Sequence, residues 1–152
     1  MARLIMNYPS KDAWIDVLEK KNERGEKVEV EQVLDASSVI SAKKLIHDQV
    51  SVPDDVLSFI SGLCNSTRNS ARVMLGASPT AAVSLLNASR GHAAIIRGSD
   101  NVTIEDVKSV AFDVLNHRLL IKQSDISDSG ADDESRISAE SIITEIIEAG
   151  GK

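Results

Sequence analysis

The spacing of apolar residues along this chain predicts helices. Residues 104–115 carry apolar side chains at intervals of three and four positions, the period of an α-helix with one buried face. This stripe consists of Ile104, Val107, Val110, Ala111, Val114 and Leu115. The same period predicts a helix from Ser10 to Asn22, a short helix capped by Ser41 and a longer helix that begins at Asp54.

Two helix starts are marked by strong capping signals. Ser78 is followed by Pro79, and proline suits the first helical position because its missing N–H would have no partner there. This helix is expected to run to Arg97 and to end at Gly98. Thr103 begins the next helix, whose first turn carries two acidic residues at its positive end.

The two ends of the chain carry different patterns. The run RLIMNY, which stops at Pro9, predicts an extended segment, and QSDISDSGADDES is too acidic and too poor in apolar groups to order itself. Isoleucines 142, 143, 146 and 147 predict a terminal amphipathic helix. The predicted organisation is an extended lead-in (1–9), a helical domain (10–122), a flexible acidic linker (123–136) and a C-terminal helix (137–150). The fold class is an all-α helical bundle.

The composition of the chain limits the kinds of core, binding partner and location that it can have. Aromatic residues make up only 3% of the chain, so the core must be built from aliphatic side chains. The net charge of −6 argues against nucleic-acid binding, which relies on summed Lys and Arg contacts. No apolar run is long enough to span a membrane, and Cys64 alone cannot form an internal disulfide, so a cytoplasmic location is expected.

Catalytic and metal-binding motifs are missing from the sequence. It contains no GxxxxGK[ST], HExxH, CxxC or GxSxG pattern. The three histidines, His47, His92 and His117, fall on different predicted elements, whereas a zinc site needs three or four close ligands. Asp132-Asp133-Glu134 is interpreted as a solubilising charge run. These residues predict a binding or regulatory module that does not catalyse a reaction alone.

Several short motifs, in their order along the chain, resemble the C-terminal lid of MoxR-type AAA+ ATPases. The family pattern is approximately DRF…YPS…GASPRA…LL…RG…VTxEDV…VLxHR. The matching segments are Arg3-Leu4 with Tyr8-Pro9-Ser10, Val50 to Val56, Ser66-Thr67-Arg68, Gly76 to Ala82, Leu85-Leu86, Arg97-Gly98, Val102 to Val107 and Val114 to Arg118. The resemblance covers residues 3–121.

The resemblance implies a role in ATP hydrolysis by a larger protein. In such ATPases the nucleotide and Mg²⁺ lie between an α/β core and the lid, and a hexamer completes each site. The lid's sensor 2 arginine corresponds to Thr80 here, so the charge is missing, although the turn Ser78-Pro79-Thr80 is still expected to face the nucleotide. Arg3 matches an arginine that projects toward the neighbouring subunit's nucleotide.

The expected partners are therefore the ATPase core, neighbouring subunits and an unknown client protein that is remodelled in a chaperone-like way. The isolated chain is expected to bind neither ATP nor Mg²⁺ strongly and to have no activity. Two alternatives remain open: a free-standing helical adaptor that binds a protein partner, and a histone-like DNA-binding module, against which the acidic charge argues.

Overall fold

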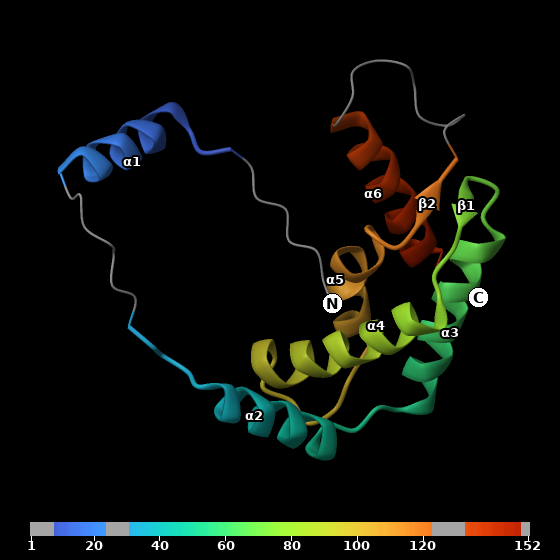
Figure 1. Ribbon diagram of the computed structural model, residues 1–152. Coiled ribbons are helices and arrows are strands. Elements are labelled where there is room, and N and C mark those ends of the chain that lie inside the picture. The colour runs from blue at the N-terminus through green and yellow to red at the C-terminus, as the bar shows by residue number, and fades with distance from the viewer. Residues whose placement is uncertain (1–7, 24–30, 123–132, 150–152) are drawn as a thin grey trace.

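The computed structural model describes residues 8–23, 31–122 and 133–149, and for residues 133–140 it describes the backbone alone. In chain order the elements are α1 (Lys11–Glu23), α2 (Ala36–Gln49), α3 (Asp54–Asn69), β1 (Val73–Leu75), α4 (Pro79–Gly91), η1 (His92–Ile96), α5 (Ile104–Leu115), β2 (Leu120–Ile121) and α6 (Asp133–Glu148). Figure 1 shows α3, α4, α5 and α6 gathered into one bundle. The all-α prediction is confirmed.

The core lies where α3, α4, α5 and α6 meet, and it is almost entirely aliphatic. Its side chains with essentially no exposed surface include Leu63, Leu85, Ala93, Val107, Leu115 and Ile143. Small residues such as Ala81 and Ala111 are also fully buried, and they let α4 and α5 approach closely. The apolar stripes predicted for α3 and α5 therefore face this core, although Leu57 of α3 is partly exposed.

The caps of α4 and α5 form as the sequence predicts. The Ser78 hydroxyl accepts a hydrogen bond from the Ala81 N–H (3.3 Å), and Pro79 occupies the first helical position. Thr103 and Asp106 form a reciprocal capping box, in which each side chain accepts from the other residue's N–H. Both helices therefore begin at the expected residues.

The helix predicted from Ser78 to Arg97 forms, and its last turn widens into the π-helix η1. There the Arg97 N–H donates to the His92 carbonyl, five residues back (3.2 Å). Both His92 and Arg97 also bond to Asp106 of α5, and we attribute the wider turn to this shared partner. Gly98, with φ of 64°, adopts the left-handed conformation and ends the helix as expected.

The helix α2 begins earlier than the sequence predicted. Its cap is Asp35, which accepts from the Ser38 N–H (2.7 Å), and not Ser41. Hydrogen bonds from the side chain and the backbone of Ser38 lower the pKa of Asp35 to about 2. None of the side chains of α2 is fully buried, although Ile46 packs against the core. It is thus a loosely attached outer helix, lying alongside α4 in Figure 1.

Two short backbone pairings tie the bundle together. The strands β1 and β2 pair antiparallel, with Val73 opposite Ile121, and the Lys122 N–H donates to the Arg72 carbonyl (2.9 Å). A single parallel bridge joins Ser51, just before α3, to Asn101, just before α5. These pairings add a two-stranded sheet to a fold that is otherwise helical.

The helix α1 lies apart from the bundle in Figure 1. It begins as predicted, and the Ala13 N–H donates to the Ser10 hydroxyl (3.3 Å). Its predicted apolar face is not covered, because Trp14, Val17 and Leu18 are all about half exposed or more.

The terminal helix α6 begins at Asp133, whereas the acidic pattern predicted a linker up to residue 136 and a helix from 137. Acidic residues are favoured in the first turn of a helix, a preference that the linker prediction overlooked. The apolar face of α6 docks on the bundle, because Ile142 and Ile143 are buried there and Ile146 and Ile147 pack against it. Residues 1–7, which include Arg3, and the linker residues 123–132 lie outside the described residues.

Candidate functional site

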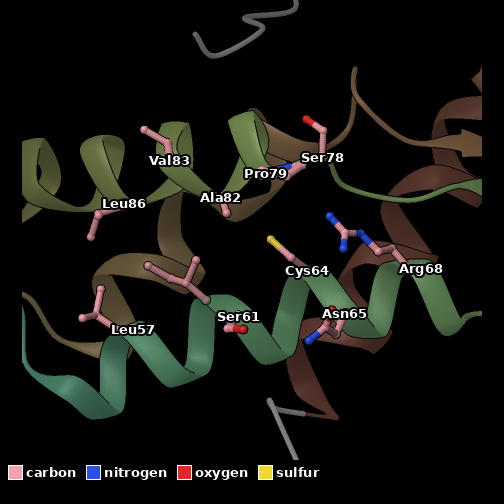
Figure 2. Close-up of a pocket in the computed structure, with 11 residues that line it drawn as sticks. Leu57, Ser61, Cys64, Asn65, Arg68, Ser78, Pro79, Ala82, Val83 and Leu86 are labelled. Atoms are coloured by element: carbon pink, nitrogen blue, oxygen red, sulfur yellow. The ribbon is translucent and has the colours of Figure 1, made fainter.

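A groove of about 340 Å³ runs between α3 and α4. Figure 2 shows its walls, with α3 contributing one side and the start of α4 the other. The lining residues are Leu57, Ile60, Ser61, Cys64, Asn65, Arg68, Ser78, Pro79, Ala82, Val83 and Leu86. Two of the residues assigned to the site from the sequence, Ser78 and Pro79, are among them.

The groove has an apolar end and a polar end. Leu57 and Leu86 face each other at one end, whereas Arg68 reaches from α3 toward the first turn of α4 at the other (Figure 2). The start of α4 carries the positive end of the helix dipole. A guanidinium and a helix start therefore share one end of an otherwise apolar groove, an arrangement that suits a ligand with an apolar body and an anionic end.

Hydrogen bonds fix the loop before α4 to the last turn of α3. The Arg68 Nε donates to the Ala77 carbonyl (2.8 Å), and the Ala77 N–H donates to the Thr67 hydroxyl (2.9 Å). That hydroxyl in turn donates to the Cys64 carbonyl (2.6 Å), and Thr67 is buried. Because both backbone groups of Ala77 are bound by neighbouring residues of α3, the start of α4 is held at a set position beside Arg68.

The close approach of this loop depends on Gly76. A Cβ atom at this position would lie 2.6 Å from Cγ and 2.7 Å from Cα of Arg68. The contact with the Arg68 backbone cannot be relieved by rotating a side chain, so any larger residue would push the loop away from α3. The motif match at Gly76 to Ala82 thus includes a glycine with a steric requirement, which the sequence did not reveal.

The structure places Thr80 in the first turn of α4, where it is exposed to solvent and does not line the groove. The role proposed for the turn Ser78-Pro79-Thr80 stays a prediction. Arg68, which the sequence left open between a helix-terminal charge and a phosphate contact, is the cation at the polar end. Arg3 lies outside the described residues, and its match to an arginine finger also stays a prediction.

The groove does not activate its cysteine. Cys64 is 6% exposed, and burial raises the pKa of its thiol, an effect that the nearby positive charge of Arg68 partly opposes. A raised pKa keeps the thiol protonated and therefore weakly nucleophilic. Cys64 acts as a small apolar wall residue, as its position in the α3 stripe indicated.

A second polar cluster joins η1 to α5 around a buried carboxylate. Asp106 accepts hydrogen bonds from Arg97 Nη2 (2.8 Å) and Nε (3.1 Å), and its Oδ1 lies 2.8 Å from His92 Nδ1. The Thr103 N–H and hydroxyl also donate to it. Burial alone would raise the pKa of Asp106, but these donors hold it well below its usual range.

This cluster occupies two polar side chains of the turn between α4 and α5. The Arg97 guanidinium is bound to Asp106 and to the Asn101 carbonyl, at the end of its helix. His92 is likewise occupied by Asp106. The pairing could not be found from the sequence, because it joins residues of two elements across the Gly98 turn.

Within residues 8–23, 31–122 and 133–149, no three His, Cys, Asp or Glu side chains gather closely enough to hold a metal ion. In the same part of the chain, no helix has the length and apolar content that crossing a membrane requires.

The family model described as the AAA lid domain matches residues 65–146, more than half of the chain. The chain belongs to the AAA lid domain family.

Two similar proteins extend the comparison. The chain is 26% identical over 147 residues to "Uncharacterized protein YeaC" of Bacillus subtilis (strain 168), covering 97% of this chain and 43% of that protein. A crystal structure of a "putative ATPase" from Cytophaga hutchinsonii ATCC 33406 shares the fold with a TM-score of 0.71 at 22% identity, covering 95% of this chain and 45% of that one. The chain thus spans less than half the length of each relative.

Proposed function

We propose that this chain is the lid of a MoxR-type AAA+ ATPase and that it couples ATP binding and hydrolysis to chaperone-like remodelling of partner proteins. The observation that carries the proposal is the polar end of the α3–α4 groove, where Arg68 lies beside the first turn of α4. Membership of the AAA lid family and the fold shared with a protein described as an ATPase support it.

In this proposal the chain supplies one side of a nucleotide site, and a core domain with a P-loop supplies the other. ATP and Mg²⁺ bind only in the complete assembly, where ATP provides the phosphoanhydride that is cleaved. Arg68 and the Thr80 N–H, at the positive end of α4, are the groups of this chain suited to a phosphate.

The coupling would use the clamp between α3 and α4. Thr67 and Arg68 hold both backbone groups of Ala77, so a displacement of the start of α4 is passed to α3. A lid that follows the phosphates would therefore move as one body and would carry the rest of the bundle with it. Hexameric neighbours and a client protein complete the proposed assembly.

The test is to restore an arginine at position 80 in the full-length ATPase. Thr80→Arg adds a planar cation at the start of α4, and we expect ATP turnover to rise about tenfold, as one added transition-state contact of about 1.4 kcal/mol would give. Steady-state ATPase assays measure this. Thr80→Gln is the matched control, because it adds comparable length without charge and should leave turnover unchanged. Equal turnover of all three proteins would show that position 80 does not face the phosphates.

A further inference from the structure

A second groove, of about 550 Å³, lies between α2 and the C-terminal half of α4 with η1. It is separate from the α3–α4 groove and shares no lining residue with it. Its walls consist of Lys43, Ile46, His47, Ser84, Asn87, Ala88, Arg90, Gly91 and Ile95.

The charge of this second groove is opposite to that of the whole chain. Acidic residues outnumber basic ones by 23 to 17 in the sequence, yet no carboxylate is among the lining residues. Lys43 and His47 come from α2, and Arg90 comes from α4 on the other wall. The only carboxylate that the described part of the chain brings into an ion pair with these three is Asp48, at 3.3 Å from His47.

Arg90 gives the clearest sign that a counter-charge is missing. Its Nε atom is buried and has no hydrogen-bond partner within the described residues. A buried donor without a partner destabilises the structure, and the donors of a guanidinium are suited to carboxylates. The side chain is therefore poised for an acceptor that the described residues do not supply.

The walls favour an acidic peptide over a compact phosphate. They are formed by interior and last turns of α2 and α4 and by η1, where backbone N–H groups are bonded within the helix. Phosphates are usually held by the free N–H groups of a helix start, and no helix start lines this groove. Ser84 and Asn87 add polar groups to the walls, and three apolar side chains complete them: Ile46 and Ala88 are partly buried, and Ile95 is 72% exposed. Spaced cations around an apolar surface suit a segment that carries both carboxylates and apolar side chains.

We propose that the α2–α4 groove binds an acidic peptide segment of a protein partner, with its carboxylates at Lys43, His47 and Arg90 and an apolar side chain against Ile46 and Ile95. The inference rests on the groove alone and holds whether or not the α3–α4 groove contacts a nucleotide.

The probe is a synthetic peptide of alternating Glu and Leu, titrated into the ¹⁵N-labelled chain and followed by NMR. We expect shift changes centred on residues 43–47 and 87–95, and binding that weakens as salt is added. Arg90→Gln should weaken binding about tenfold and Lys43→Gln about threefold. Lys44→Gln is the matched control, because it removes the same charge from the next residue of α2, which does not line the groove.

Four results would overturn the proposal. The first is equal binding by a peptide with Gln in place of Glu, and the second is an equal effect of Lys43→Gln and Lys44→Gln, which would leave only a general charge effect. The third is pyrophosphate displacing the peptide at comparable concentration, which would make the groove a phosphate site. Lys43 is exposed, so its variant keeps the test valid even if Arg90→Gln fails to fold. An absence of any binding also refutes the proposal.

Discussion

A single carboxylate carries much of the specific polar structure of this lid. Asp106 is 1% exposed, and it binds the cap residue of its own helix, the arginine that follows η1 and the histidine that begins η1. A buried charge is tolerated only where it is fully paired. Here all the donors lie in η1 or between η1 and the start of α5, so Asp106 holds this part of the chain together. The residue type was noticed in the sequence as a first-turn acid, whereas its role as a junction was not.

Asp106→Asn should destabilise the fold by about 3–5 kcal/mol, because it removes the charge but leaves the Arg97 guanidinium beside it without a counter-charge. Urea denaturation measures the loss. Glu105→Gln is the control, since this neighbouring side chain is 78% exposed and its removal should cost less than about 1 kcal/mol. Equal losses in the two variants would show that the Asp106 cluster adds nothing specific.

The same residue predicts how stability changes with pH. The pKa of Asp106 is depressed in the folded chain, so its stabilisation is present above the pKa of an unfolded aspartate, about 3.9, and is lost as the pH falls below that value. Denaturation midpoints measured between about pH 5 and pH 2 should fall less steeply in Asp106→Asn than in the unchanged chain. Parallel pH profiles would contradict the depressed pKa.

At the scale of elements, local signals predicted some boundaries well and others poorly. The starts of α4 and α5 are encoded in Ser78-Pro79 and in Thr103 with Asp106, because caps act within one turn. The π-turn of η1 depends on a contact with α5. The order of residues within one helix does not show which residue of another helix it will contact, so the sequence did not predict this turn. The sequence predicted only one side of the polar end of the α3–α4 groove. The motif match identified the turn at the start of α4, but the position of Arg68 beside that turn depends on how α3 packs.

The helix α6 should contribute to the stability of the whole bundle. Ile143 is 1% exposed in the core, so Ile143→Ala should lower the free energy of unfolding by about 2–5 kcal/mol. Ile147→Ala makes the same change at a partly buried position of the same helix and should cost clearly less. Chemical denaturation followed by circular dichroism gives both values. Similar small effects would mean that α6 is not part of the cooperative unit.

At the scale of the whole molecule, the proposed function gives this chain only one side of a nucleotide site. A dissociation constant of 1 mM requires about −4 kcal/mol, and one guanidinium beside one helix start in open solvent is not expected to exceed it. Calorimetric titration of the chain with ATP should therefore show an affinity no tighter than millimolar and no hydrolysis. Micromolar binding by this chain would contradict a lid that depends on a separate core.

The two backbone pairings described for the fold restrict how this lid can deform. The Ser51–Asn101 bridge joins the points from which α3 and α5 start, and the β1–β2 pairing joins the segments that follow their ends. Helices fastened to each other at both ends cannot slide lengthwise without breaking one of these ties. Lengthwise shear between α3 and α5 is opposed by these pairings, which favours rotation of the two helices about their common length. Of the helices that contact the bundle, α2, whose side chains are not fully buried, is the least restrained.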